Sequence, residues 1–310
     1  MDTSVLDKLI KCTSPSRVIE KASLSEYTSF KTGGPADYLV KVGNPLEIQK
    51  IVAMAKESGI PFYVIGNGTN MLVSDEGYRG IVISLREMDN DIQAIKSSDE
   101  ETLSLSCSAG CTLAKLANEA ASLGYSGLEF AAGIPGSVGG AVVMNAGAYG
   151  GEIKDIFEYA DVLDENSDVV RLKKEDMKFG YRRSVIQERQ YIVLDVQFRL
   201  KKGEEKAIRA EIKELNERRR EKQPLEYASA GSTFKRPEGL FAGKLIEDAG
   251  LKGFAVGDAA VSEKHCGFLI NKGKATSEDI YELISQVIEK VYEKSGVVLE
   301  PEIKLLGFDE

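Results

Sequence analysis

The sequence predicts an α+β protein with a larger N-terminal unit and a C-terminal unit of about a hundred residues. Two observations lead to this fold class. Segments whose apolar residues recur at helical spacing alternate with short apolar runs that are typical of buried strands. The chain has 310 residues, which is enough for two hydrophobic cores, and no repeat or low-complexity tract interrupts it. We therefore expect a chain of two domains, or of one large domain with an appendage.

The composition excludes several classes of protein. The chain has 40 basic and 49 acidic side chains and a net charge of −9, which argues against a protein that grips nucleic acid by neutralising phosphates. It has one histidine, His265, and no tryptophan. Sites that need two or three imidazoles are thereby excluded, and we predict no metal site. A Ser-His-Asp triad would have to use His265 alone.

The sequence shows no signal for export or for membrane insertion. Its first residues mix both charge signs without a long apolar stretch, which is unlike a signal peptide. No run of about 18 apolar residues occurs. The four cysteines, Cys12, Cys107, Cys111 and Cys266, lack CxxC spacing, so we expect free thiols. These features predict a cytoplasmic protein that binds neither membranes nor nucleic acid.

In the N-terminal part, capping residues and periodicity predict the elements in order. Asn44-Pro45 supplies an N-cap and a first-turn proline, and Gly59 is placed to end the helix that follows. A second amphipathic helix is expected over 112–123, closed by Gly124. Strands are expected at the short apolar runs 61–66, 81–85, 102–109, 157–165 and 191–200.

The C-terminal part begins after Lys201-Lys202-Gly203, which we interpret as a linker. An amphipathic helix that ends in a basic run is expected next, followed by a shorter helix around 242–249. Thr276 and Asp279 have the spacing of a capping box and predict a long helix after them. A terminal strand is expected over 302–307.

Two glycine-rich loops are the first candidates for a ligand site. GNGTN (66–70) follows a predicted strand, and GIPGSVGG (133–140) lies in the segment 127–152, which is too irregular for one helix or strand. Glycine lets a backbone approach an anion closely and point N–H groups at it. Neither loop has a dinucleotide or P-loop fingerprint, and either alone fits a structural turn better than a phosphate cradle. Together with YTSFKTGGPA (27–36), they favour a large ligand that carries phosphate.

A second set of candidates is polar. Arg182 and Arg183 follow Tyr181 in FGYRRS, and Ser232 lies in a Gly-Ser turn just before two basic residues. Glu302 belongs to LEPEIK, where charged residues occupy alternate positions of the predicted last strand. From spacing alone, each also fits an ordinary role as a surface ion pair, a turn former or a solvated strand face.

These motifs, in this order and spacing, closely resemble the UDP-N-acetylenolpyruvoylglucosamine reductases, the MurB family of peptidoglycan synthesis. The resemblance extends from Tyr27 to Gly307 and rests on YTSFKTGGPA, VIGNGTNMLVSDEGYRG, GLEFAAGIPGSVGGAVVMNAGAYGGE, FGYRRS, KQPLEYASAGSTFKRP, AGKLIEDAGLKG and LEPEIKLLG. No insertion separates the arginine motif from the serine motif. In this the chain is similar to the shorter-chain class of the family, which lacks an aromatic loop that covers the substrate in the longer class.

The resemblance implies both a fold and a cofactor. It implies an FAD-binding module of the vanillyl-alcohol oxidase and p-cresol methylhydroxylase type in residues 1–205, with two subdomains split near 80. An α+β substrate-binding domain would occupy 206–310, and we expect 302–310 to be able to pack back on the N-terminal unit. FAD would be held without a covalent bond, and NADPH would be the co-substrate. The residues expected to hold FAD lie in the three glycine-containing loops: Tyr27, Thr28, Lys31, Thr32, Gly33, Gly34, Gly66, Asn67, Gly68, Thr69, Asn70, Gly133, Ile134, Pro135, Gly136, Ser137, Gly139 and Gly140.

The implied reaction reduces the enolpyruvyl ether of UDP-N-acetylglucosamine to a lactyl ether, giving UDP-N-acetylmuramate. Hydride passes from NADPH to FAD and then to C3 of the enolpyruvyl group, which leaves negative charge at C2 and the carboxylate. Three residues match the family's catalytic set: Arg182 would stabilise the carboxylate charge, Glu302 would act with it, and Ser232 would donate a proton to C2. Contacts to the substrate are carried over to Tyr181, Lys222, Arg236 and Lys304.

Other interpretations stay open at this point. Another FAD-dependent oxidoreductase of the same fold, such as an alcohol oxidase, would need an active-site base and often a covalent flavin link, for which His265 is the only histidine. A flavin- or nucleotide-sugar-binding protein without catalysis would not need a proton donor such as Ser232. The sequence does not decide between NADPH and NADH, between Arg182 and Arg183 at the flavin, or between oligomeric states.

Overall fold

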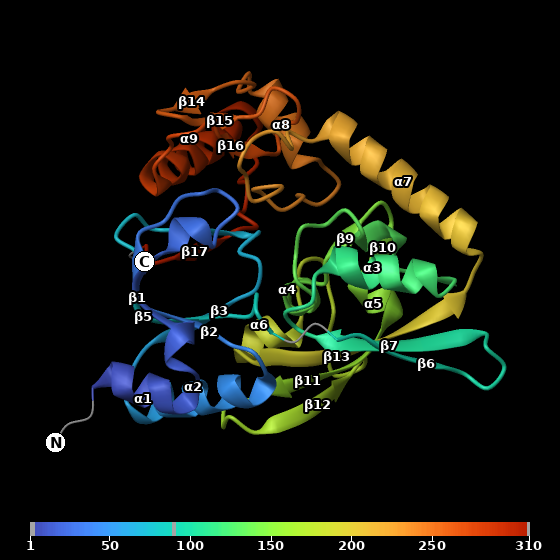
Figure 1. Ribbon diagram of the computed structural model, residues 1–310. Helices are drawn as coiled ribbons and strands as arrows, with labels where there is room; N and C mark the ends of the chain where they lie inside the picture. Colours follow the sequence, from blue (N-terminus) through green and yellow to red (C-terminus); the bar gives the residue numbers. More distant parts are fainter. Residues whose placement is uncertain (1–3, 89–90, 309–310) are drawn as a thin grey trace. The chain divides into compact units, whose positions relative to one another are not determined.

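The structure is a computed structural model that describes residues 4–88 and 91–308 (Figure 1). Its contacts divide the chain into two compact units. The first unit comprises Met1–Ile19, Leu39–Asn67 and Ile81–Arg218. The second unit comprises Glu20–Tyr38, Gly68–Gly80 and Arg219–Glu310. The expected division at residue 205 concerns the binding of FAD and substrate, and it stays a prediction.

The first unit contains an antiparallel sheet with the strand order β12-β11-β13-β7-β6, and β8 pairs with β13 outside this path. In β7, the buried residues Leu103, Leu105 and Cys107 alternate with less buried hydroxyl residues, which is the period of two expected of a half-buried strand. The three longest predicted strands are thus confirmed. The strands are β6 (Gln93–Lys96), β7 (Thr102–Ser108), β8 (Tyr125–Ser126), β11 (Phe157–Leu163), β12 (Val169–Lys173) and β13 (Ile192–Lys202).

The interpretation of Lys201 and Lys202 as a linker is wrong, because both residues continue β13. Lys201 pairs with Thr102 of β7 and with Ser126 of β8. Lys202 pairs with Tyr125 of β8. Two neighbouring strands therefore extend the ladder beyond the apolar part of β13, where the lysine side chains lie exposed.

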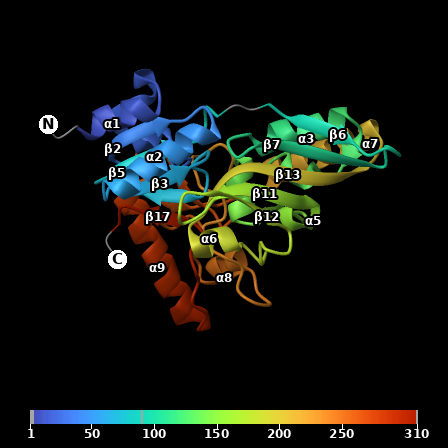
Figure 2. The ribbon, with the colours of Figure 1, turned by 90° about the horizontal axis from the view of Figure 1, so that it is seen from below.

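Helix α2 of the first unit begins and ends at the predicted signals. The Asn44 side chain accepts a hydrogen bond from the Glu47 backbone N–H at 3.0 Å, Pro45 opens α2, and Gly59 follows it with a φ of +64°. Helix α1 lies alongside α2 in both ribbon views (Figure 1; Figure 2). Helices α4 and α5 contact β13 of the sheet. The helices are α1 (Val5–Cys12), η1 (Pro15–Arg17), α2 (Pro45–Glu57), α3 (Leu113–Ser122), η3 (Glu129–Ala131), α4 (Val138–Val143), α5 (Ile153–Ile156), α6 (Val185–Arg189) and α7 (Glu205–Lys222), which from Arg219 on belongs to the second unit.

A further sheet has the strand order β1-β2-β5-β3, and in it β3 pairs with β5 in parallel. A short antiparallel pair, β9 with β10, follows α4 in the sequence. The strands are β1 (Val18–Ser23), β2 (Pro35–Lys41), β3 (Phe62–Ile65), β5 (Tyr78–Ser84), β9 (Gly147–Ala148) and β10 (Gly151–Glu152). The short turn η2 (Leu24–Glu26) separates β1 from the loop before β2.

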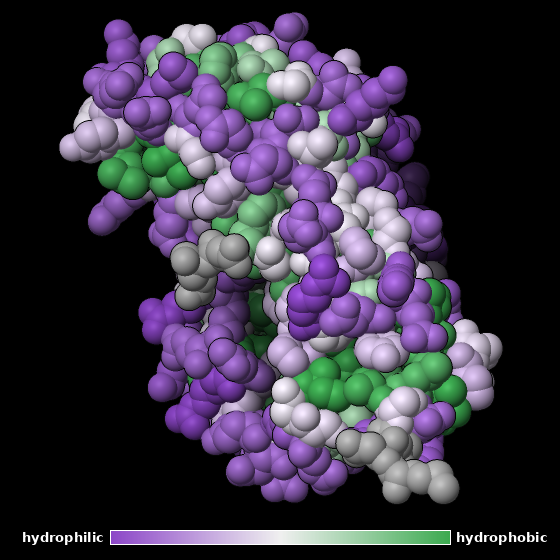
Figure 3. Space-filling view, turned by 90° about the vertical axis from the view of Figure 1, so that its left-hand side faces the viewer, coloured by the Kyte–Doolittle hydropathy of each residue, from purple (hydrophilic) through white to green (hydrophobic). Residues whose placement is uncertain are grey.

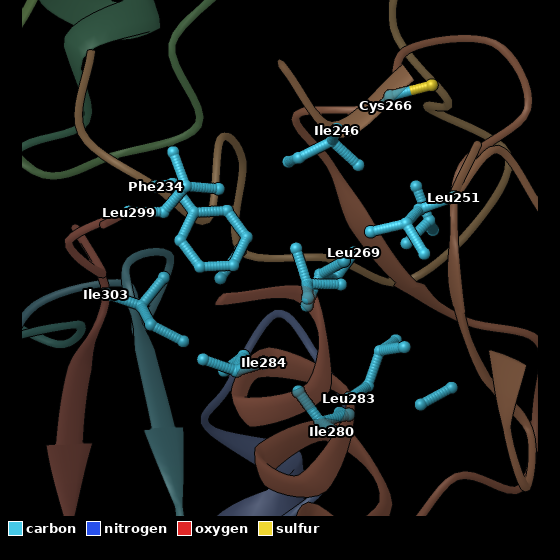
Figure 4. Packing of buried hydrophobic residues seen from close by; sticks show 14 of the residues in the cluster. Phe234, Ile246, Leu251, Cys266, Leu269, Ile280, Leu283, Ile284, Leu299 and Ile303 are labelled. Carbon is cyan, nitrogen blue, oxygen red and sulfur yellow. The ribbon is translucent and has the colours of Figure 1, made fainter. Parts of the chain in front are cut away.

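The second unit has its own core, formed where α9 packs against α8 and the sheet β14-β15-β16 (Figure 4). The predicted capping box is confirmed: Thr276 and Asp279 each accept a hydrogen bond from the other's backbone N–H at 3.0 Å. Phe30 and Leu72 bury their side chains in the same core. The elements are β4 (Met71–Val73), α8 (Ala242–Asp248), β14 (Ala255–Val256), β15 (Ala259–Val261), β16 (Leu269–Asn271), α9 (Ser277–Ser295) and β17 (Lys304–Leu306).

The terminal strand differs from its prediction at its start. It begins at Lys304 and pairs in parallel with β4, so that Lys304 lies opposite Met71. Glu300 and Glu302 precede the strand, and their expected place at alternate positions of it is wrong. The reason lies in the backbone of Glu302, whose N–H donates to Thr233 and not to a ladder partner on β4.

Hydrophilic residues cover most of the face seen in Figure 3, in keeping with the many charged side chains of the sequence. The four cysteines all lie in the described residues and are free, as predicted. Within residues 4–88 and 91–308, no helix is both long enough and apolar enough to cross a membrane.

Candidate active site

In the first unit, the two predicted glycine-rich loops touch each other. Gly66 follows β3 directly, and a Cβ atom on it would lie 2.1 Å from the hydroxyl oxygen of Ser137. The side-chain amide of Asn67 donates to the carbonyl of Pro135 at 3.3 Å. Because Gly66 has no side chain, the Ser137 side chain can pack directly against its backbone.

The second of these loops is shorter than predicted. It ends at Ser137, whose hydroxyl caps α4, so Gly139 and Gly140 belong to the first turns of a helix. The stretch before α3 holds this end of the loop: Val138 N–H donates to the Cys111 carbonyl at 2.8 Å, and Gly139 N–H donates to Ala109 at 2.9 Å. The loop before the cap lies at least partly exposed.

In the second unit, the loop Tyr27–Gly34 lies against Gly68. Ser29 N–H donates to the Gly68 carbonyl at 2.9 Å, and a Cβ atom on Gly68 would meet the Tyr27 carbonyl oxygen at 1.9 Å. The Thr28 hydroxyl donates to the Thr32 carbonyl at 2.8 Å and closes the loop on itself. The hydroxyl of Thr32 is buried and has no hydrogen-bond partner among the described residues.

Arg182 lies at the tip of a tight turn in the first unit. Gly180 N–H donates to the Arg183 carbonyl at 3.0 Å, and Arg183 N–H returns a bond to Gly180 at 3.3 Å. Arg182 has a φ of +53°, a left-handed conformation that a residue with a Cβ rarely adopts. Its guanidinium donates to the Gly147 carbonyl at 3.2 Å and lies 5.0 Å from the ring centroid of Tyr181.

The neighbouring arginine makes a different contact. Arg183 pairs with Glu188 through Nε at 2.6 Å, and the two side chains are 65% and 37% exposed. Arg182 is half-buried, and its guanidinium binds the carbonyl of Gly147 in β9. The two consecutive arginines therefore point to different partners, and the exposed ion pair is made by Arg183.

Ser232 and Glu302 lie on adjacent, hydrogen-bonded segments of the second unit. Glu302 N–H donates to the carbonyl of Thr233, the residue after Ser232, at 2.8 Å. Phe234 and Ile303, which follow the two candidates, are buried in the core shown in Figure 4. These apolar anchors fix both segments, while Ser232 stays exposed.

Asn70 connects the glycine-rich loop to Glu302. Its side-chain amide donates to the Glu302 carbonyl at 3.3 Å, and its own carbonyl accepts from Lys304 N–H at 3.0 Å. The structure thus brings a residue predicted to hold FAD next to two residues predicted to act on the substrate. Asn70 is more than two hundred residues away from Glu302 and Lys304 in the sequence, so no local pattern predicts this contact.

The residues expected to contact the substrate are spread over both units. Tyr181 belongs to the turn of Arg182 and is 50% exposed. Lys222 is the last residue of α7, and Lys304 opens β17; both side chains are exposed. The guanidinium of Arg236 stacks 4.0 Å from the ring centroid of Phe241.

His265 is connected to the segment of Ser232 through Gly267. Its Nδ1 accepts the Gly267 N–H at 3.1 Å, and the Gly267 carbonyl accepts Thr233 N–H at 3.0 Å. Although the residue is exposed, its ring packs edge-on against Phe268 with centroids 5.0 Å apart. This partial burial lowers the pKa of His265, so the imidazole is neutral at neutral pH and Nδ1 can accept.

We expect a pH-dependent contribution of His265 to stability. Because its pKa is lower in the folded chain than the ordinary value of about 6.5, the unfolded chain binds more protons between the two values. The stabilisation is therefore complete above about pH 7 and is lost as the pH falls through the folded pKa. Urea unfolding midpoints of the wild type and His265→Asn, which keeps an acceptor near Nδ1 but does not titrate, should converge as the pH is lowered from 8 to 5. A difference that stays constant would contradict this role.

Among the residues that the structure describes, no group of three or more His, Cys, Asp or Glu side chains could hold a metal ion.

Two family models match the chain. One, described as the C-terminal domain of UDP-N-acetylenolpyruvoylglucosamine reductase, matches residues 223–306, and one described as an FAD binding domain matches residues 36–173. The UDP-N-acetylenolpyruvoylglucosamine reductase of Caldanaerobacter subterraneus subsp. tengcongensis is 48% identical over 303 residues, which are 98% of each chain. That of Lachnoclostridium phytofermentans is 49% identical over 307 residues, which are 99% of this chain and 98% of the relative.

A solved structure gives the same result. The crystal structure of UDP-N-acetylenolpyruvylglucosamine reductase (MurB) from Thermus caldophilus superposes with a TM-score of 0.78 at 35% sequence identity, covering 94% of this chain and 99% of that chain. Together with the mixed helix and strand content, these matches confirm the predicted fold class. The chain therefore belongs to the UDP-N-acetylenolpyruvoylglucosamine reductase family and carries the family's FAD-binding domain.

Proposed function

We propose that the protein reduces the enolpyruvyl ether of UDP-N-acetylglucosamine to the lactyl ether, forming UDP-N-acetylmuramate with NADPH as the reductant. The single observation that best supports this is the pair of hydrogen bonds made by the backbone of Glu302. Its backbone is hydrogen-bonded on one side to the residue after Ser232 and on the other to Asn70 of the glycine-rich loop. Hydrogen bonds thus join the segments of Ser232 and Glu302, to which we assign the proton donor and the carboxyl group, to a loop to which we assign the cofactor. The proposal includes a cytoplasmic location, which the sequence led us to expect.

The glycine-containing loops fit a cofactor with a diphosphate. A Cβ atom at Gly66 would collide with the Ser137 side chain, and one at Gly68 with the Tyr27 backbone, so these loops pack tightly. The buried Thr32 hydroxyl, which lacks a partner among residues 4–88 and 91–308, is available to a phosphate or ribose oxygen. We assign FAD to the loops that contain these residues and those around Ser137. Bound there, FAD supplies hydride transfer from NADPH to carbon.

The chain's own residues supply the charge and the proton. Reduction at C3 of the enolpyruvyl group leaves negative charge at C2 and the carboxylate, and the enzyme gains rate by binding this charge more tightly than the substrate. The planar guanidinium of Arg182 suits two carboxylate oxygens. Glu302 acts with it as a protonated or hydrogen-bonded carboxyl group, since a bare carboxylate would repel the dianion. Ser232 then donates a proton to C2.

The remaining cations suit the nucleotide end of the substrate. The proposal assigns the phosphates or carboxylate of a UDP-sugar to Lys222, Arg236 and Lys304, and a further contact to the substrate to Tyr181. On a protein of net charge −9, cations at a binding site attract anionic ligands locally. The ligand class is a small nucleotide-sugar, and NADPH would use the same cations for its phosphates.

Product analysis tests the proposal. The purified protein, reconstituted with FAD, is incubated without oxygen with NADPH and the enolpyruvyl nucleotide, and the products are identified by mass spectrometry. We expect a nucleotide heavier by two hydrogen atoms and one NADP⁺ for each product molecule. A parallel reaction with NADH measures the preference for the co-substrate. Oxidation of NADPH without the heavier nucleotide would contradict the substrate assignment and keep the flavin assignment.

A further inference from the structure

Arg182 sits in a backbone conformation that its surroundings must impose. Its φ of +53° is unfavourable for a residue with a Cβ, and strain of this kind persists only where neighbouring groups fix the backbone. The turn itself is closed by the two backbone bonds between Gly180 and Arg183. Two side chains outside the turn add to them. The Gln187 amide donates to the Arg182 carbonyl at 3.2 Å, and the Asn145 amide donates to the Gly180 carbonyl at 3.0 Å.

Asn145 is the stronger of these two anchors. It is completely buried, and its amide group makes three hydrogen bonds. Nδ2 donates to Gly180 and, at 3.0 Å, to the Glu152 carboxylate, while Oδ1 accepts the Lys154 N–H at 2.9 Å. Because the amide donates to two residues and accepts from a third, its orientation is fixed.

The carboxylate that Asn145 binds is itself held in its charged form. Lys154 forms an ion pair with Glu152 at 2.6 Å and lowers the pKa of this carboxyl group. The Asn145 amide and the positive charge of Arg182 lower the pKa further. Glu152 therefore stays ionised and provides a fixed acceptor for Asn145 over the ordinary pH range.

The same short stretch also receives the guanidinium. Asn145 lies two residues before Gly147, whose carbonyl accepts the hydrogen bond from Arg182 at 3.2 Å. Asn145 thus ties the backbone at the start of the arginine turn to the stretch that binds the arginine head group. We infer that Asn145 is a positioning residue that sets the place of Arg182. The inference rests on the proposed role of Arg182 at the substrate carboxylate.

The expected effect follows from this geometry. In Asn145→Ala, the Gly180 carbonyl loses its side-chain donor, and the turn can move relative to Gly147. A shift of about 1 Å in a group that orients substrate can cost about a hundredfold in rate. We expect this loss in the reoxidation of the reduced enzyme by the enolpyruvyl nucleotide, measured by stopped flow. Reduction of the enzyme by NADPH and its FAD content should stay as in the wild type.

A double-mutant cycle separates positioning from general damage. If Asn145 acts through Arg182, Asn145→Ala should slow reoxidation about a hundredfold in the wild type and less than about threefold in Arg182→Gly. Equal slowing in both backgrounds would overturn the inference.

Asn118→Ala is the matched control, because this exposed asparagine bonds only to its own helix among the described residues. If Asn145→Ala does not fold, Gln187→Ala provides a second test, because it removes the other anchor at a partly exposed residue. Reoxidation within twofold of the wild type in both variants would also overturn the inference.

A measurement without substrate keeps the inference apart from the proposed function. In protein labelled with ¹⁵N-arginine, the Nε–H signal of Arg182 is assigned by its loss in Arg182→Lys. Asn145→Ala should lower the heteronuclear NOE of this signal and leave that of Arg183, which pairs with Glu188, unchanged. An unchanged Arg182 signal would contradict the positioning role. If the signal changes but the wild type is not reoxidised by the nucleotide, the proposed function fails and the positioning of Arg182 stands.

Discussion

Ser232→Ala is expected to slow the reoxidation of reduced enzyme by the enolpyruvyl nucleotide by about a thousandfold, since general acid catalysis contributes about 10²–10⁴. The exposed hydroxyl of Ser232 lies on the segment hydrogen-bonded to Glu302, and in the proposed mechanism its removal leaves the C2 carbanion without its donor. Reduction of the flavin by NADPH should keep its rate, because that half of the reaction needs no proton at C2. Stopped-flow spectroscopy measures the two halves separately.

Two further variants sharpen this prediction. Ser229→Ala changes a serine three residues earlier in the same segment and should leave both rates within about twofold. Ser232→Cys replaces the hydroxyl with a more acidic thiol and should retain more of the reoxidation rate than Ser232→Ala. If Ser232→Ala reoxidises as fast as the wild type, the proton comes from another group and the assignment of Ser232 is wrong.

Arg182→Gly is expected to separate activity from stability. Removing one group that stabilises developing negative charge costs about 10²–10³ in rate, so reoxidation by the enolpyruvyl nucleotide should fall by this factor. The free energy of unfolding should change little. Glycine adopts the φ of +53° without the cost of about 1–2 kcal/mol that a Cβ brings, and this gain offsets its extra unfolded-state entropy of about 0.5–1 kcal/mol.

Arg183→Ala is the matched control, since it removes the neighbouring guanidinium and its exposed pair with Glu188. An exposed pair contributes about 0–1 kcal/mol, so both rates and the unfolding midpoint should stay near the wild type. Loss of reoxidation in Arg183→Ala, with Arg182→Gly unaffected, would reverse the assignment of the two arginines.

Local elements of the fold could be predicted because their signals are local. The caps of α2 and α9 are set by residues three apart, and the structure confirms both. The start of α4 was missed because Val138 follows a glycine-rich loop, in which a short helix has no apolar period to reveal it. The start of β17 was missed because its partner β4 lies more than two hundred residues away in the sequence.

The site was predictable in its parts but not in its connections. The resemblance supplied Ser232, Glu302 and Asn70 as separate candidates, yet the bond between Asn70 and Glu302 depends on the parallel pairing of β4 with β17. Asn145 gave no signal, because a buried asparagine whose partners are a carbonyl and a carboxylate looks like any other residue of a glycine-rich stretch. Hydrogen bonds of this kind are tertiary, and no spacing rule encodes them.

The most direct test of the central claim is an anaerobic visible spectrum of the FAD-loaded protein, recorded before NADPH, after NADPH, and after the enolpyruvyl nucleotide. We expect flavin bands that bleach with NADPH and return when the nucleotide is added. Bands that bleach and do not return would contradict the proposed substrate, and a protein that takes up no FAD would contradict the proposed cofactor and the reaction that depends on it.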